Sequence, residues 1–235
     1  MKPTLPTVLS FNGGYVDTAG YLALQGLFTA HVTGNFVTIG AALVFGTSGV
    51  VAKLLALPVF CLVIIVTRLV SFNLPVRWPV LETMLTLKLL LLLVAAVLAI
   101  AMGPFANGDG APAIIVGMTL VSAMALQNAA QRIHLGAAPP TTLMTGTTTQ
   151  IMIDIADMIR GVSGVARDAI RSRLRRMCVA VASFAAGAAA GALLFSAIGS
   201  WCFALPPVVA LLARITAKSA LTAPTGTPGP QSATT

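Results

Sequence analysis

The chain alternates between long apolar segments and short polar connections. Six apolar segments are close to bilayer length, since a membrane-spanning helix takes roughly 20 residues. They cover residues 6–25, 52–70, 83–104, 111–131, 177–198 and 200–216. This pattern predicts an all-α membrane protein with six transmembrane helices.

Two further stretches, 34–46 and 146–160, are too short or too polar to span. The first covers about 20 Å at 1.5 Å per residue, against a hydrocarbon core of about 30 Å. The second carries Asp154 and Asp157 and follows Pro139-Pro140, where a helix cannot continue. We predict that both are re-entrant half-helices, which enter and leave the membrane on the same side.

The positive charges indicate a membrane topology. The net charge of +8 comes largely from clusters between or after the apolar segments, and cytoplasmic loops are enriched in Lys and Arg. The arginine-rich loop 160–176 is therefore expected inside, and the loop 104–110, which lacks Lys and Arg, outside. Six spans with two re-entrant half-helices satisfy this distribution and leave Lys53 as the one basic residue outside. Eight full spans would place the 160–176 loop outside.

This charge distribution predicts a multi-pass membrane protein with both termini in the cytoplasm. The expected partner is the lipid bilayer, because the basic residues follow loop positions. No nucleic-acid partner is expected, since the charges form no dedicated basic surface.

The chain also repeats its own pattern. Thr33-Gly34-Asn35 recurs as Thr145-Gly146-Thr147, and each triplet opens a short helix. Three spans per repeat is an odd number, so the two copies have opposite orientations, as in many transporters. We predict a single membrane domain over 1–220, with repeats at about 6–104 and 111–216, and a disordered C-terminal tail over 221–235.

Composition argues against a soluble enzyme. The chain is 57% hydrophobic and 9% charged, whereas an average soluble domain is about 25% charged. Its three cysteines are far apart, which argues against a disulfide framework or a metal site. No nucleotide-binding, metalloprotease or serine-hydrolase motif occurs. We expect no enzymatic activity, no cofactor and no metal.

Polar residues within or beside the apolar segments define the candidate site. Half-helix N-termini present free N–H groups and a positive dipole end, and Gly allows close backbone approach. The two breaks could equally cap each other in a sealed core. Asp17 could carry a proton, bind a cation or join helices by a hydrogen bond. His31 could relay protons or make a structural hydrogen bond. The predicted solute- or ion-binding residues are Asp17, His31, Thr33, Gly34, Asn35, Gln127, Asn128, Thr145, Gly146 and Thr147.

Two other features concern packing. Lys88 lies in the apolar run 83–104 and is expected to extend its charged end to the inner surface. Ser183, Gly187 and Gly191 form a stripe of small residues at four-residue spacing. Such a stripe is a helix-packing face, either within the bundle or between the protomers of a homo-oligomer.

Two motifs resemble those of a known family. The stretches GGYVDTAGYLALQGLFTAHVTGNFVTIG (13–40) and ALQNAAQRIHLGAAPPTTLMTGTTTQ (125–150) are similar to the YoaK family of bacterial membrane proteins. This chain has Thr18 where the family usually has Ala, and Ala30 where it has Ser. The resemblance covers residues 8–215. It implies a multi-pass protein of the bacterial cytoplasmic (inner) membrane, of unknown function.

The predicted function is a transporter or channel for a small polar or ionic solute. Its site would lie at the membrane midplane, where the N-termini of the two half-helices meet. The alternative is a non-transporting membrane scaffold or assembly protein whose polar centre is purely structural.

Overall fold

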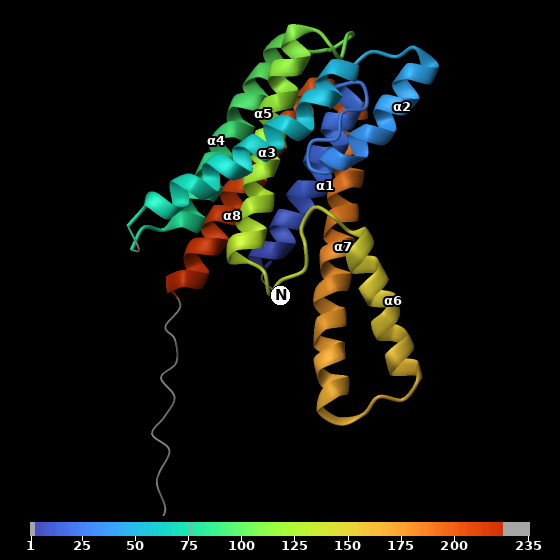
Figure 1. Ribbon diagram of the computed structural model, residues 1–235, viewed down its shortest axis with the longest axis vertical. Helices are drawn as coiled ribbons and strands as arrows, with labels where there is room; N and C mark the ends of the chain where they lie inside the picture. Colours follow the sequence, from blue (N-terminus) through green and yellow to red (C-terminus); the bar gives the residue numbers. More distant parts are fainter. Residues whose placement is uncertain (1–2, 76, 223–235) are drawn as a thin grey trace, which may run out of the picture.

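The computed structural model describes residues 3–75 and 77–222, which form a helical bundle without strands. The α-helices are α1 (Leu5–Ala23), α2 (Asn35–Phe45), α3 (Val50–Asn73), α4 (Val80–Met102), α5 (Ala111–His134), α6 (Thr145–Ile159), α7 (Gly164–Ile198) and α8 (Leu205–Thr222). Two 3-10 helices are η1 (Val32–Gly34) and η2 (Gly199–Ala204). A helix occurs at each of the eight predicted segments (Figure 1). Most of the predicted tail, from residue 223 onward, lies outside the described residues.

Several helices are long and apolar enough to cross a membrane. By length and composition these are α3, α4, α5 and the run Gly164–Ser219, which joins α7, η2 and most of α8. Large apolar side chains such as Leu62 and Leu69 on α3 and Leu93 on α4 are more than half exposed. Exposed apolar surface on this scale marks a membrane or partner contact. The fold is therefore that of a multi-pass membrane protein.

The central helix is α1, which packs against α7, α8, α5 and η2. Glycines bring α1 and α7 close together. A Cβ added to Gly187 would lie 2.0 Å from the carbonyl oxygen of Phe11, and one on Gly191 would lie 2.8 Å from that of Tyr15. The small-residue stripe of α7 therefore packs within the bundle, against α1 of the same chain.

The other half of the bundle is organised around α5, which packs against α3 and α4, while α4 also packs against α8. Polar contacts connect α1 to the end of the chain. The Tyr15 hydroxyl donates to the carbonyl oxygen of Cys202 at 2.8 Å, and the Asn12 amide donates to that of Pro206 at 3.1 Å. These bonds join the first helix to η2 and α8.

The connection between α4 and α5 caps α3. The Asp109 carboxylate accepts hydrogen bonds from the backbone N–H groups of Gly49, Val50, Val51 and Ala52, at 2.8–3.2 Å. N–H groups at a helix start have no partner within the helix, and a carboxylate matches its positive end. Partial burial raises the pKa of Asp109, but the four donors outweigh burial and hold the pKa below its ordinary value of 3.8.

The stretch 160–176 is not the loop that its charge pattern predicts. It is mostly helical, because α7 begins at Gly164 and continues for 35 residues. Such a helix is about 52 Å long, well beyond the roughly 30 Å hydrocarbon core. Charge alone cannot distinguish a basic loop from a basic helix that continues out of the membrane.

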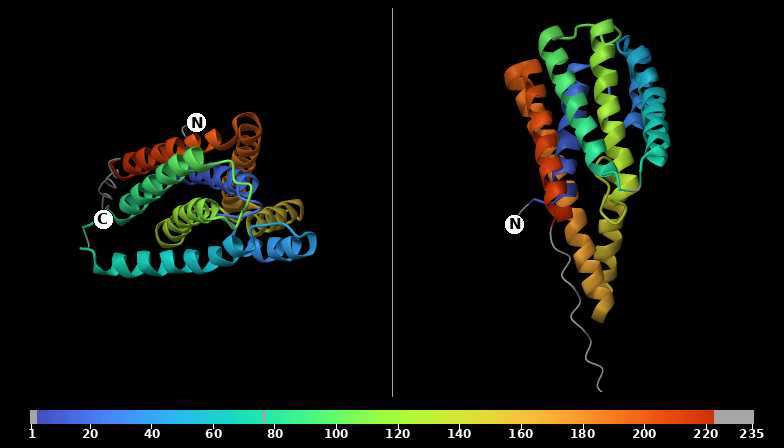
Figure 2. Two further views of the ribbon diagram at one scale, coloured as in Figure 1. Left: turned by 90° about the horizontal axis from the view of Figure 1, so that it is seen from above. Right: turned by 90° about the vertical axis from the view of Figure 1, so that its left-hand side faces the viewer.

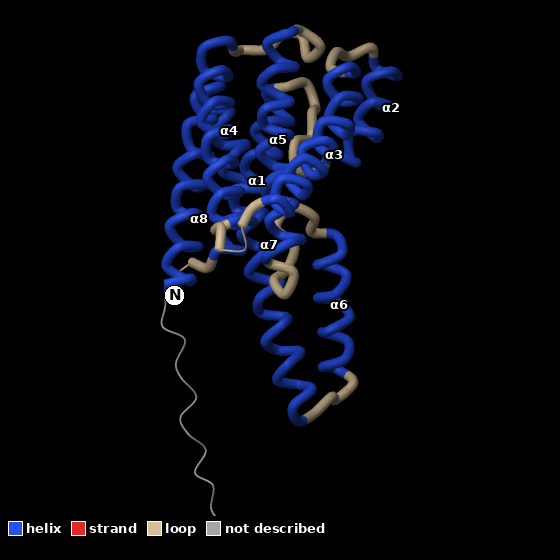
Figure 3. The backbone as a smooth tube through the Cα atoms, turned by 60° about the vertical axis from the view of Figure 1, so that its left-hand side comes forward, coloured by secondary structure: helices blue, strands red, loops and turns tan. Residues whose placement is uncertain are grey.

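The α6–α7 hairpin, formed by α6 and the first half of α7, extends below the ends of α1, α5 and α8 (Figures 1 and 3, and Figure 2, right). Arg173 on α7 holds it together by donating to the Asp154 carboxylate on α6 at 2.5 and 2.9 Å. The Asp154 side chain is buried. Because α6 lies beyond the bundle, a half-helix at membrane depth over 146–160 is not confirmed.

Candidate functional site

Asp17, in the last third of α1, organises the first connecting segment (residues 24–34). One carboxylate oxygen accepts hydrogen bonds from the backbone N–H groups of Thr29 at 2.8 Å, Ala30 at 2.7 Å and His31 at 3.4 Å. Buried backbone donors need such a partner when the chain leaves regular structure. Of the three roles considered for Asp17, a structural hydrogen-bond acceptor is the one that these contacts describe.

Asn35 closes the same segment. Its side chain accepts from the Phe28 N–H at 2.8 Å and donates to the Phe28 carbonyl at 2.9 Å, and it is buried. The His31 ring lies against the Phe28 ring, with centroids 5.7 Å apart. A Cβ on Gly34 would meet the Phe28 ring at 3.0 Å, so this position favours glycine. Thr33 is exposed. The predicted cluster of Asp17, His31, Gly34 and Asn35 is thus gathered at one place.

Gln127 on α5 lies at the centre of a second buried polar cluster. Its amide nitrogen donates to the Leu9 carbonyl of α1 at 2.9 Å and to the Thr141 hydroxyl at 3.0 Å. Its amide oxygen accepts from the Lys88 ammonium of α4 at 2.5 Å. The cluster therefore connects α1, α4, α5 and the second connecting segment (residues 135–144).

Lys88 does not extend to the surface as the sequence suggested. It is 1% exposed, and it pairs with no carboxylate among the described residues. Its position on α4, about 12 Å from the start of that helix at 1.5 Å per residue, faces Gln127 rather than the interface. A buried charge at membrane depth is costly, which makes Lys88 a candidate functional residue.

Asn128, next along α5, holds the second connecting segment. Its amide oxygen accepts from the Thr142 hydroxyl at 2.7 Å, and its nitrogen donates to the Met124 carbonyl at 3.0 Å. The segment also packs tightly on α1, because a Cβ on Gly13 would lie 2.7 Å from the Thr141 carbonyl oxygen. Asp17 and Asn128 thus act alike, since each fixes a threonine-containing segment that leads to a short helix.

The two connecting segments reach one groove, which we call the Asn128 groove. It has a volume of about 350 Å³. Thr33 and Asn128 are the hydroxyl and amide side chains in its lining, and Cys61 lies on its α3 wall. The complete lining is Ala30, Val32, Thr33, Leu57, Phe60, Cys61, Ile64, Ile65, Asn128 and Leu143. Thr33 and Asn128 therefore line the same groove, in largely apolar surroundings.

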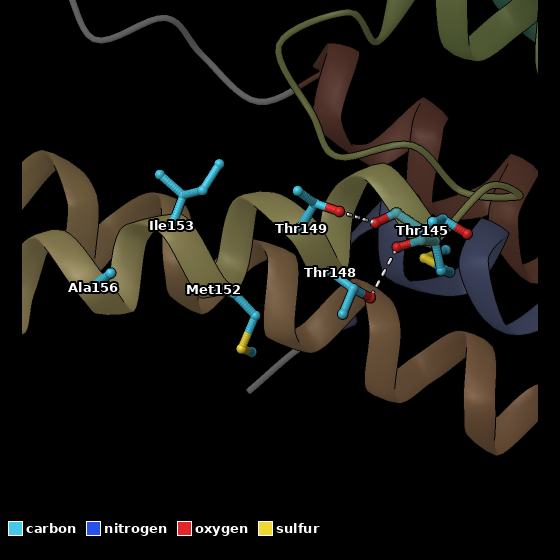
Figure 4. Close-up of a pocket in the computed structure, with 7 residues that line it drawn as sticks. Thr145, Thr148, Thr149, Met152, Ile153 and Ala156 are labelled. Atoms are coloured by element: carbon cyan, nitrogen blue, oxygen red, sulfur yellow. Dashed lines mark hydrogen bonds between the residues drawn. The ribbon is translucent and has the colours of Figure 1, made fainter.

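The second predicted triplet, Thr145-Gly146-Thr147, does not line the Asn128 groove. Thr145 and Gly146 are exposed at the start of α6, and Thr147 is buried with its hydroxyl unpaired. A hollow of about 740 Å³ beside them is lined by α6 and the preceding Met144 (Figure 4), which makes it an open helix face. Leu143, rather than Thr145, reaches the Asn128 groove. The two triplets do not share a site.

Sequence reasoning missed several members of these clusters. Lys88 carried a visible signal, namely a charge within an apolar run, but a single sequence does not reveal which neighbour its tip meets. Thr141 and Thr142 stood in the quoted motif without being assigned a role. Thr29 had no signal, because its contact with Asp17 depends on how the chain folds back. Among the described residues, no cluster of three or more His, Cys, Asp or Glu side chains could hold a metal ion.

Both clusters and the groove lie within a stretch that is matched by a protein-family model. That model, described as Protein of unknown function (DUF1275), matches residues 5–216. The chain belongs to this family. The DUF1275 match includes all eight helices except the last residues of α8.

A curated relative agrees with the DUF1275 assignment. The chain is 34% identical over 161 residues to the UPF0700 transmembrane protein YoaK of Bacillus subtilis (strain 168). The alignment covers 66% of this chain and 68% of the relative. The resemblance to the YoaK family is thereby confirmed. No solved structure matches this DUF1275 protein.

Proposed function

We propose that this DUF1275 protein is a membrane transporter or channel for a small polar or ionic solute. The observation that carries the proposal is the Asn128 groove, where the two irregular segments of the chain meet beside a polar side chain from each half. Irregular backbone within a membrane bundle is expected where it is buried in protein or lines a watery cavity. Thr33 and Asn128 are the proposed solute-binding residues.

Helix packing supports the inverted-repeat part of the proposal. If α1–α4 correspond to α5–α8, the contact of α1 with α7 corresponds to that of α5 with α3. The contacts α2–α3 and α6–α7 correspond in the same way, as do α1–α8 and α4–α5. In Figure 1, α2 and α6 run toward opposite ends of the molecule from starts near its middle. Such an exchange of contacts is expected for two copies related by a two-fold axis in the membrane plane, and it supports the proposed inverted repeat.

In this proposal, the buried polar residues have distinct roles. Asp17 and Asn35 shape the first connecting segment, and Gln127 positions the second through Thr141. Lys88 donates a hydrogen bond to the amide oxygen of Gln127, which lies next to the solute-binding Asn128 on α5.

The alternative is a membrane scaffold with a structural polar core. It is favoured by the internal pairing of Asp17, Asn35 and Gln127, and by the mainly apolar lining of the groove. The two functions differ in whether water enters the groove. A transporter needs a hydrated groove in at least one state, whereas a scaffold keeps it dry.

The native Cys61 provides the test. In a protein whose other cysteines, Cys178 and Cys202, are replaced by alanine, Cys61 is the single thiol on the groove wall. A charged, water-soluble methanethiosulfonate reagent should modify it in membranes. The matched control is Leu62→Cys in the cysteine-free protein, because Leu62 is the exposed neighbour on α3 that does not line the groove.

If the protein is a transporter, the reagent should modify Cys61 quickly and the Leu62→Cys thiol slowly. In addition, Thr33→Val should reduce solute flux into proteoliposomes without loss of folded protein, because it removes a hydroxyl group from an exposed side chain of the groove. Equal, slow modification at both positions would contradict the proposal and favour the scaffold.

A further inference from the structure

A second cavity, separate from the Asn128 groove, lies where the α6–α7 hairpin leaves the bundle. We call it the basic pocket, and its volume is about 560 Å³. One wall is a face of α7, and the others come from the start of α1 and from the second connecting segment. Its lining is Pro3, Thr4, Pro6, Thr7, Ala138, Pro139, Ser172, Arg175, Arg176, Val179 and Ala180.

The basic pocket lies at the level where lipid headgroups are expected. Counted back from the end of α7 at Ile198, about twenty residues span the roughly 30 Å hydrocarbon core and reach Val179. Arg175 and Arg176 occupy the next turn, just outside that core. The lining is therefore apolar on the membrane side, at Val179 and Ala180, and basic on the water side.

The arginine side chains in this pocket are suited to a phosphate group. Guanidinium groups bind phosphate oxygens through paired N–H donors, which makes arginine the preferred residue for this recognition. Arg176 is held by a hydrogen bond from its guanidinium to the Ser172 hydroxyl at 2.8 Å. The preceding turns of α7 also carry Arg167 and Arg171 with one acidic residue, Asp168, while Arg173 is paired with Asp154 of α6.

We propose that the basic pocket binds an anionic phospholipid, with its phosphate on Arg175 and Arg176 and its glycerol and upper acyl chains along Val179, Ala180 and Pro6. The order of basic and apolar residues along α7 matches the order of headgroup and chain in a phospholipid. A soluble phosphate would contact only the basic part of the pocket, at Arg175 and Arg176, and would leave its apolar part empty. This inference does not depend on the proposed transport function, because the pocket and the groove share no residue.

The test compares the full-length protein in phosphatidylcholine nanodiscs with and without phosphatidylglycerol. Bound ligand stabilises the folded state, so the anionic lipid should raise the unfolding temperature by roughly 2–4 °C. The variant R175Q/R176Q should lose this shift. The control variant R167Q/R171Q removes the same two charges from exposed sites of the same helix that do not line the pocket, and should keep it.

Two further arms make the result decisive. Val179→Trp fills the apolar half of the pocket while it keeps both arginines, and should also abolish the shift even if R175Q/R176Q folds poorly. Inorganic phosphate added to phosphatidylcholine nanodiscs should have no effect. If R167Q/R171Q loses the shift in unfolding temperature to the same extent, the lipid is attracted by charge in general. If inorganic phosphate stabilises the protein, the pocket is a site for a soluble anion. Either result would overturn the proposal.

Discussion

At the scale of single residues, Asp109 shows how one carboxylate supports a helix from a distant part of the chain. It accepts four N–H groups at the start of α3 and lies in the connection between α4 and α5. Because its pKa is below the ordinary value when the protein is folded, the stability that it contributes is present above that value. This stability is lost as the pH falls through the lowered folded pKa.

Asp109→Asn should therefore destabilise the protein near neutral pH, by roughly 2–4 °C in unfolding temperature. The difference between the native and variant proteins should shrink as the pH is lowered below 3.8. Thermal unfolding of the detergent-solubilised proteins across this pH range measures the effect. Asp168→Asn, at an exposed position of the α6–α7 hairpin, is the control. A pH-independent difference would show that the Asp109 charge is not responsible.

Asp17 and Lys88 illustrate what a single sequence reveals about a site. The sequence singled out Asp17 as a candidate site residue, because a charge in an apolar run is costly. It could not show that the partners are backbone N–H groups, because these are invisible in side-chain patterns. Lys88 carried the same signal, but its tip could reach either the interface or a buried amide. Only the positions of α4 and α5 decide between the two.

At the scale of helices, the α1–α7 interface depends on glycine. A Cβ on Gly187 would overlap the Phe11 carbonyl of α1 at 2.0 Å, so any side chain pushes the two helices apart. Gly40 on α2 is also helical, but a Cβ there would meet nothing within 4 Å. These two glycines form a matched pair.

Gly187→Ala should sharply reduce the yield of folded protein, because the overlap is with backbone and cannot be relieved by a side-chain rotation. Gly40→Ala should be neutral or stabilising by up to about 1 kcal/mol, since alanine favours helix. Size-exclusion profiles and unfolding temperatures of both variants give the comparison. Equal behaviour of the two variants would mean that the α1–α7 contact is not tight in the membrane.

The lengths of the apolar segments predicted each α-helix of residues 3–75 and 77–222, but not every boundary. The apolar segments 83–104 and 111–131 nearly coincide with α4 and α5, because burial in lipid requires apolar residues throughout. The start of α7 was missed by 13 residues, counted from the predicted 177 to Gly164. The polar first turns of α7 need no run of apolar residues, so the length of the apolar segment does not reveal where this helix begins.

At the scale of the whole molecule, the charge pattern predicts which side of the membrane the α6–α7 hairpin and the 104–110 loop occupy. A reporter fused after Ser163, at the tip of the α6–α7 hairpin, should read cytoplasmic, and one fused after Asn107, between α4 and α5, should read external. The reason is the concentration of arginine at the hairpin and its absence from the 104–110 loop. Alkaline phosphatase and fluorescent-protein fusions measure both. Reporters on the same side would require a different number of spans.

The central position of α1 has a consequence for biogenesis. α1 is not among the helices that are apolar enough to be recognised as a span, and it carries the buried Ser10, Asn12 and Asp17. Its partners in η2 and α8 follow 187 and 194 residues later, which at about 5–20 residues per second means a delay of roughly 10–40 s. The Tyr15 hydroxyl and the Asn12 amide therefore lack these acceptors until η2 and α8 have been synthesised. The helix at the centre of the bundle is thus completed by elements that are synthesised well after it.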